Sequence, residues 1–158
     1  MTKTTLTKQE QKEILEKAKK LCLSELKSQL DKVKHIRLFG SIIRNEFGYN
    51  PKGKKTSKGI RKWSDIDFLL IVKDGFKIPK KWKEKFKVSD KSWFCYYLPK
   101  GMKIKAKIKN KTVNPSVEFA FAVIYENALK DKAKYKRIAI TGLPFKKSIF
   151  KKRYIRVK

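Results

Sequence analysis

Residues 64–73 have the sequence Ser-Asp-Ile-Asp-Phe-Leu-Leu-Ile-Val-Lys, an apolar run that begins with two carboxylates. Apolar side chains occupy both alternating positions, and this pattern predicts a central β-strand that is covered on both faces. Side chains two residues apart on a strand point to the same face, so we expect Asp65 and Asp67 to lie side by side where the strand begins. Asp74-Gly75 then ends the strand.

The two carboxylates indicate a metal site. Like charges a few ångströms apart disfavour each other unless a cation lies between them. Magnesium prefers oxygen ligands and usually takes one or two carboxylates, while waters and substrate phosphates complete its shell. Asp65 and Asp67 therefore predict bound Mg²⁺, or Mn²⁺ in its place. An Asp-x-Asp pair on its own also occurs at exposed strand starts that bind nothing, so its surroundings decide its meaning.

The segment before this strand offers a phosphate-binding turn. Residues 35–40 are rich in strand formers, and residues 41–48 predict a short helix that Ser41 opens. A glycine at such a turn lets the backbone approach a ligand closely, and the N–H groups at the helix start favour a phosphate. We expect Gly40-Ser41 to hold a triphosphate that reaches a metal on the aspartates. Arg44 has two interpretations, a phosphate contact or a local cap.

The N-terminal segment predicts an amphipathic helix. Thr7-Lys8-Gln9-Glu10 has the spacing of a capping box, in which a hydroxyl and a carboxylate satisfy free backbone N–H groups at a helix start. Apolar residues then recur at three- and four-residue intervals, at Ile14, Ala18, Leu21, Cys22, Leu26 and Leu30. This helix is expected to bury one face.

The remaining elements are predicted from shorter patterns. Residues 49–62 hold a proline, two glycines and six basic residues, which predicts a mobile loop. The other predicted elements are a short helix over 79–87, a hairpin of strands 93–98 and 102–109 with a turn at 99–101, a strand over 117–124, and a helix over 126–137.

This order of elements predicts an α/β (α+β) fold, with a mixed β-sheet packed on helices. A chain of 158 residues with 41% hydrophobic content allows one compact core. We predict one domain over 1–145, a basic loop insertion at 49–63 and a basic tail at 146–158. Cys22 and Cys95 are expected to be buried free thiols.

The location is predicted from what the sequence lacks. No apolar run reaches the roughly 18 to 20 residues that span a bilayer, and the first residues lack the apolar block of a signal peptide. We therefore expect a soluble cytoplasmic protein without membrane contact.

The charge predicts a polyanionic partner. The chain carries 43 Lys+Arg against 14 Asp+Glu, a net charge of +29. Such a surface attracts nucleic acid and repels a second copy, so we expect a monomer when free. Lysine-rich codon usage is the alternative explanation, but it should enrich glutamate too. The best candidate surface for a phosphate backbone is the alternating row of the predicted hairpin, Lys103, Lys105, Lys107 and Lys109.

Two segments together match a known signature, Leu38-Phe39-Gly40-Ser41-Ile42-Ile43-Arg44 and Ser64-Asp65-Ile66-Asp67-Phe68-Leu69-Leu70. They resemble the Gly-Ser … Asp-x-Asp motif of the DNA polymerase β-like nucleotidyltransferases, especially the minimal stand-alone members. The resemblance is close over 36–73 and looser to about residue 143. The separation between the two halves of the motif is longer than is usual in the family, and the extra length falls in the basic loop.

The resemblance implies a polymerase β palm-like fold and a two-metal site. Gly40 and Ser41 would hold the nucleoside triphosphate, and Asp65 and Asp67 would bind two metal ions. A third acid from a later strand would complete the site. Glu118 is the acid placed at the start of such a strand, although the family more often has aspartate there; the alternative is a solvated strand-end acid.

The same resemblance implies transfer of a nucleoside monophosphate from a triphosphate, ATP or CTP, to an acceptor hydroxyl. The positive charge favours an RNA acceptor such as the 3′ end of a tRNA. A protein hydroxyl, as in antitoxin-like members, or a small antibiotic are alternative acceptors. A third hypothesis is a nucleic-acid-binding protein without catalysis. His35, the only histidine, is expected to be structural rather than a general base, and Trp63 either stacks on a base or packs locally.

Overall fold

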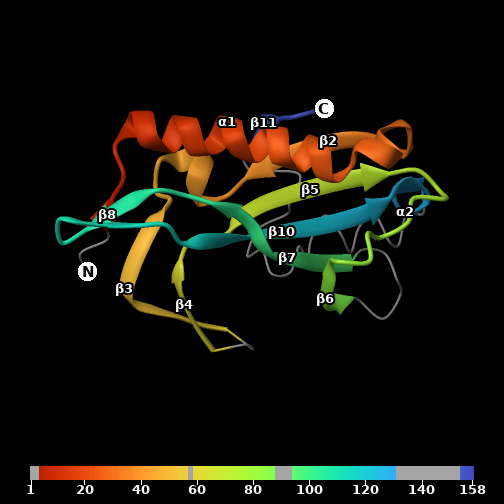
Figure 1. The fold of residues 1–158 in the computed structure, drawn as a ribbon. Helices are drawn as coiled ribbons and strands as arrows, with labels where there is room; N and C mark the ends of the chain where they lie inside the picture. Colours follow the sequence, from red (N-terminus) through yellow and green to blue (C-terminus); the bar gives the residue numbers. More distant parts are fainter. Residues whose placement is uncertain (1–3, 57–58, 88–93, 131–153) are drawn as a thin grey trace.

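The computed structural model describes residues 4–56, 59–87, 94–130 and 154–158. A sheet with strand order β11-β2-β5-β10-β7-β6 forms the centre of this part of the chain (Figure 1). β5 and β10 run parallel, whereas the other neighbouring pairs are antiparallel. Its strands are β2 (Val33–Phe39), β5 (Ile66–Val72), β6 (Lys83–Lys87), β7 (Phe94–Lys103), β10 (Ser116–Tyr125) and β11 (Tyr154–Arg156). The predicted mixed sheet packed on helices is confirmed at this level.

The N-terminal helix α1 (Lys8–Glu25) begins at the predicted capping box. The Thr7 hydroxyl accepts a hydrogen bond from the Glu10 N–H at 3.1 Å, and the Glu10 carboxylate accepts one from the Thr7 N–H at 2.7 Å. The chain then continues as a 3₁₀ helix, η1 (Lys27–Lys32). The predicted apolar face is buried at Ile14, Ala18, Cys22 and Leu26.

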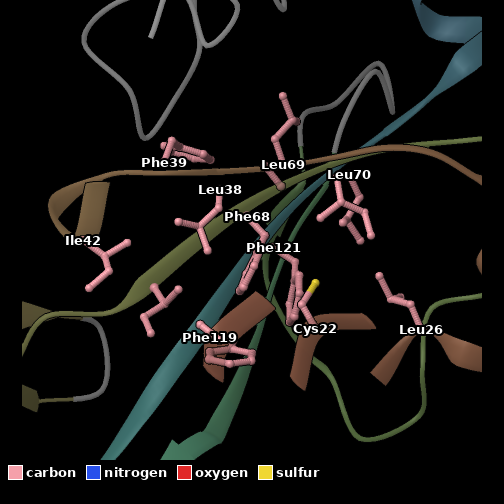
Figure 2. Close-up of a cluster of buried hydrophobic side chains, with 14 of the residues drawn as sticks. Cys22, Leu26, Leu38, Phe39, Ile42, Phe68, Leu69, Leu70, Phe119 and Phe121 are labelled. Carbon is pink, nitrogen blue, oxygen red and sulfur yellow. The ribbon is translucent and has the colours of Figure 1, made fainter. Parts of the chain in front are cut away.

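Helix α1 covers one face of the sheet (Figure 1). The Trp82 indole N–H donates to the Glu25 carboxylate at the end of α1, at 3.0 Å, and the Trp82 ring stacks on Phe121 of β10 with centroids 3.8 Å apart. Phe121 in turn pairs with Phe68 of β5, whose ring lies 5.3 Å away. Figure 2 shows Cys22 of α1 beside these rings, so one aromatic cluster joins the helix to the two central strands.

The central strand β5 is buried on both faces, as its sequence predicts. Phe68 and Leu70 are 0% exposed on the face toward α1, and Leu69 and Ile71 are 2% and 5% exposed on the other. Figure 2 shows Leu69 directed away from the side of the cluster where α1 lies. Because side chains alternate along a strand, Asp67 shares the face of Leu69 and Ile71. The acid therefore lies on the face opposite α1.

Residues 49–56 and 59–62 lie in two paired antiparallel strands, so the predicted loop is wrong over these residues. The three strands of this small sheet are β1 (Thr4–Thr5), β3 (Gly48–Thr56) and β4 (Gly59–Trp63), in the order β1-β3-β4. The loop was predicted from proline and glycine, which usually break strands. Here a register shift between Tyr49 and Lys54 absorbs both residues as an irregularity of the ladder. The Trp63 ring lies 5.4 Å from the Tyr49 ring and packs the base of the hairpin.

The predicted hairpin over 93–109 is also wrong, because β7 runs straight through its expected turn at 99–101. These three residues bulge opposite Glu118 of β10. Gly101 is required by the close approach of the strands, since a Cβ there would lie 2.5 Å from the Phe119 ring. The pairs on either side of the bulge are Leu98 with Phe119 and Met102 with Val117.

The remaining short elements complete the described chain. They are β8 (Ala106–Ile108), β9 (Lys111–Val113) and α2 (Glu126–Lys130). The end of the segment predicted as a short helix over 79–87 forms edge strand β6 instead, because it pairs with β7. The predicted helix over 126–137 begins as α2, and its later residues lie outside the described part.

The C-terminal residues of the predicted basic tail form a strand. β11 pairs antiparallel with the second half of β2, and residues 146–153 lie outside the described part. Among the described helices, none combines the length and apolarity needed to cross a bilayer.

Candidate functional site

The three predicted acids lie at the same edge of the sheet. β5 begins directly after Asp65, and the parallel neighbour β10 is in register with it, with Ala120 beside Asp67. Glu118 precedes Phe119 as Asp65 precedes Ile66, and those two apolar residues are paired. All three acids are half-buried. The sheet topology therefore brings Asp65, Asp67 and Glu118 to one corner of the molecule.

The glycine of the Gly-Ser turn lies against one of these acids. Gly40 follows Phe39, the β2 residue that pairs with Asp67. Its backbone has φ 88° and ψ −153°, a region that residues with a side chain rarely adopt. A Cβ at this position would collide with the Asp67 carboxylate oxygen Oδ2. The two halves of the sequence motif are thus in direct contact, and only glycine fits between them.

Ser41 begins a shorter helix than the sequence predicts. The helix η2 (Ser41–Arg44) is a single 3₁₀ segment, and its end is set by Asn45, which has the left-handed φ of 55°. The Ser41 carbonyl accepts a hydrogen bond from the Glu46 N–H at 2.9 Å. The exposed Arg44 donates to the Glu46 carboxylate at 2.8 Å. This ion pair fits the interpretation of Arg44 as a local cap, and the phosphate contact stays a prediction.

Arg61 of β4 is the site residue that sequence reasoning missed. Its guanidinium Nη1 lies 2.5 Å from Asp65 Oδ2, and both side chains are mostly buried, with 23% and 16% exposure. Within the described part, the buried Arg61 Nε has no hydrogen-bond partner. The sequence predicts a cation beside the aspartates, and in this structure a guanidinium occupies that position for Asp65. Arg61 lies four residues before Asp65, in the segment predicted as a loop, so the sequence pattern did not place its side chain on the acid.

The acids fit a magnesium ion by donor type. Carboxylate oxygens are the ligands that Mg²⁺ prefers, and two of them with water form an ordinary magnesium site. In the part of the chain that the structure describes, no three His, Cys, Asp or Glu side chains gather closely enough to hold a metal. Asp65 also has to leave Arg61 before both of its oxygens can bind an ion. Asp65 and Asp67 thus supply suitable ligands, with Glu118 at the same edge.

The four lysines predicted as a single row lie on different elements. Lys103 ends β7, Lys105 lies between strands, Lys107 is in β8, and Lys109 is at the β8–β9 turn with a φ of 47°. All four are exposed, as the alternating pattern predicts. The single-strand row is wrong because the chain reverses at residues 109 and 110, not at 99–101. The Lys103 carbonyl also accepts a hydrogen bond from Lys17 of α1 at 2.9 Å.

The β3–β4 hairpin presents a stronger basic surface next to the acids. Residues 48–63 contain no acidic residue, and the hairpin returns to the sheet directly before Asp65 (Figure 1). Ile60 is 64% exposed on it. The half-buried Trp63 ring lies close to the Tyr49 and Phe47 rings, as the local-packing interpretation expects, and stacking on a base stays a prediction. The exposed basic residues of this surface are Lys52, Lys54, Lys55 and Lys62.

No family model, curated protein or solved structure matches this chain. The site has to be interpreted from its own geometry and chemistry.

Proposed function

We propose that this chain is a metal-dependent nucleotidyltransferase that transfers a nucleoside monophosphate from a triphosphate to an acceptor hydroxyl on RNA. The observation that carries the proposal is the contact of Gly40 with Asp67 at the edge where Asp65 and Glu118 also lie. A glycine lets the turn approach the carboxylate closely, so phosphate oxygens bound by the main chain of the turn would lie beside a site for a cation. The same residues carry the resemblance to the polymerase β-like nucleotidyltransferases.

In the proposed reaction, the acceptor oxygen attacks the α-phosphorus in line with the leaving group. A new phosphorus–oxygen bond forms, the bond to the β-phosphate oxygen breaks, pyrophosphate leaves, and the hydroxyl proton passes to water. Mg²⁺ or Mn²⁺ held by Asp65, Asp67 and Glu118 would neutralise phosphate charge and make the acceptor hydroxyl more acidic. Gly40 and the main chain of Ser41 would position the triphosphate, and ATP and CTP are the proposed donors.

Arg61 has a defined part in this proposal. A guanidinium pairs with a phosphate as readily as with a carboxylate, and its planar fork favours two parallel hydrogen bonds. When a triphosphate enters, Arg61 can exchange Asp65 for phosphate oxygens, which leaves Asp65 available as a ligand. Arg61 thus keeps the acid compensated when no substrate is present.

The β3–β4 hairpin supports RNA as the acceptor. Its exposed lysines are Lys52, Lys54 and Lys55 on β3 and Lys62 on β4, the strand that leads into Asp65, and a phosphate backbone lying on this hairpin would pass the proposed site. Lys54 and Lys55 should carry phosphate contacts, and replacing both with glutamine should lower the slope of log affinity against log salt by about 2. The matched variant changes Lys107 and Lys109 in the same way and should leave the slope nearly unchanged. Equal effects of the two variants would remove the hairpin as the RNA-binding surface.

The decisive experiment measures pyrophosphate release and labelling of RNA. The protein is incubated with each labelled triphosphate, magnesium and total cellular RNA. Asp67→Asn should lower both signals by at least about 100-fold, because it removes a ligand beside the reacting phosphates. Asp31→Asn, a change of the same charge at an exposed position away from the sheet edge, serves as the control. Equal activity of wild type and Asp67→Asn would contradict the proposal.

A second candidate function is nucleic-acid binding without catalysis. The specific observation in its favour is the Arg61–Asp65 ion pair, which compensates the acid without a metal. If this candidate is correct, no triphosphate labels any acceptor, while RNA binding survives replacement of Asp65 and Asp67 by asparagine. Labelling of protein or of a small molecule in place of RNA would keep the chemistry and change the acceptor.

A further inference from the structure

A basic pocket lies on the Asp67 face of the sheet, toward the end away from the acids. The cavity has a volume of about 540 Å³, within the usual range for a small-ligand site. His35 lines it and pairs with Ile71, four residues along β5 from Asp67 and roughly 13 Å away at the rise of a strand. None of the three acids lines the pocket, although Tyr154 at its edge pairs with Phe39, which in turn pairs with Asp67.

The lining combines cations with an aromatic ring. Its charged and polar members are Lys34, His35, Arg37, Glu126, Lys130 and Tyr154, and Ile71 and Leu129 supply an apolar surface. Glu126 is the one carboxylate among these lining residues, and it is paired with Lys34 at 2.5 Å. Arg37 and Lys130 remain as the cations that this carboxylate does not pair with. The lining thus combines positive charge with apolar surface.

Arg37 is held in an orientation suited to an anion. Its guanidinium carbon lies 4.3 Å from the centre of the Tyr154 ring, so the planar group stacks on the aromatic face. Stacking uses the flat face of the guanidinium and leaves the N–H groups at its edge for hydrogen bonds. Because the group is already ordered, binding a phosphate costs less conformational entropy than it would with a freely rotating chain.

The pKa of His35 reflects its burial and the positive charges around it. Burial, followed by the charges of Arg156, Arg37, Lys34 and Lys158, lowers the pKa of its imidazole. The ring is consequently neutral near pH 7 and offers one donor and one acceptor nitrogen. Of these four cations, Arg37 and Lys34 also line the pocket.

We propose that this pocket binds a nucleoside monophosphate unit, with its phosphate on Arg37 and Lys130 and its base against Tyr154 and the apolar lining. The phosphate matches the charge of these two cations, and the apolar and aromatic surface matches a planar base. The unit is either a free mononucleotide or the terminal nucleotide of an RNA. The proposal is independent of catalysis at Asp67, since it uses none of the residues at the acidic corner.

The single histidine makes the site directly observable. In proton NMR, the imidazole signal belongs to His35 alone, and it should shift in a saturable way when a nucleoside 5′-monophosphate is added. The unphosphorylated nucleoside and inorganic phosphate should each bind at least about tenfold more weakly, because each supplies only one of the two interactions. Equal binding of the nucleoside and its monophosphate would overturn the assignment of the phosphate to Arg37 and Lys130.

Variants localise the site and separate it from the proposed function. Lys130→Ala changes an exposed residue of α2 and should weaken binding about tenfold, and Arg37→Lys should do the same through loss of the planar fork. Lys20→Ala on the far side of the sheet is the charge-matched control and should bind as wild type does. Asp67→Asn should also bind normally even where it abolishes nucleotide transfer.

The source of the nucleotide is resolved with two ligands. A short single-stranded RNA with a 5′-phosphate is compared with the free mononucleotide, and the tighter ligand that shifts the His35 signal identifies the source. If saturating ligand leaves the His35 signal unmoved, or if the Lys130 and Arg37 variants bind as tightly as the Lys20 control, the pocket is not a nucleotide site.

Discussion

The contact between Gly40 and Asp67 leads to a quantitative prediction for Gly40→Ala. The backbone of Gly40, with φ 88° and ψ −153°, lies in a region that is nearly restricted to glycine, and holding an alanine there costs about 1 to 3 kcal/mol. The new methyl group would also overlap the Asp67 carboxylate, and displacing a packed group adds about 1 to 3 kcal/mol. We expect the unfolding free energy to fall by about 2 to 6 kcal/mol, the sum of these two effects.

Gly75→Ala is the matched control for this variant. Gly75 also has a positive φ, of 86°, but a Cβ there would meet no atom within 4 Å. Its destabilisation should be about 1 to 2 kcal/mol from the backbone alone. Urea unfolding followed by tryptophan fluorescence measures both variants, and the excess for Gly40→Ala reports the collision with Asp67.

A double variant isolates the contact itself. Replacing Asp67 by alanine in the Gly40→Ala background removes the carboxylate that the methyl group meets. The two substitutions should therefore be coupled by about 1 kcal/mol or more in a double-mutant cycle, with the double variant more stable than the sum predicts. If Gly40→Ala unfolds no more easily than Gly75→Ala, or if the cycle shows no coupling, the two halves of the motif do not meet as described.

Three further outcomes are expected. Arg61→Ala should tighten Mg²⁺ or Mn²⁺ binding, measured by calorimetry, because it frees Asp65 from its ion pair. Lys62→Ala removes the same charge at an exposed neighbouring position and should not tighten binding. Equal changes in affinity would mean that only the net charge matters. Gln11→Ala should lower stability by about 1 to 3 kcal/mol in urea, because the buried Gln11 amide bonds the Asn45 carbonyl and the Phe47 N–H directly after η2, and both groups would lose their partner. Burial, followed by the charge of a nearby carboxylate, raises the pKa of the Cys22 thiol. This thiol should therefore react with a disulfide reagent only after unfolding, even at pH 9. Rapid reaction at Cys22 in the folded protein would contradict its burial.

The sequence anticipated the local elements whose signals are short-range. The capping box at Thr7 and Glu10 formed as predicted, because both partners lie within one helical turn. The burial of β5 on both faces also followed from the sequence, because a strand whose side chains are apolar on both faces is stable only when both faces are covered. The exposure of Lys103, Lys105, Lys107 and Lys109 likewise followed from alternation with apolar neighbours.

The wrong predictions concern segments whose backbone conformation is set by pairing with a neighbouring strand. Proline and glycine at 49–62 and at 99–101 indicated a loop and a turn, yet both segments are held in strands because adjacent strands accept an irregularity in the ladder. The segment that ends in β6 was assigned to a helix for a similar reason. Edge pairing with β7 fixes its conformation, and that partner is not visible in the local pattern.

By itself, the sequence determined a basic surface, a buried central strand with two acids at its start, and a glycine before a turn, because each depends on residues close together in the chain. The tertiary structure alone decided that Gly40 lies against Asp67, that Glu118 shares their edge, and that Arg61 reaches Asp65. These contacts depend on strand order and register. Register is set by the packing of whole faces against one another, so it belongs to no single segment of the chain.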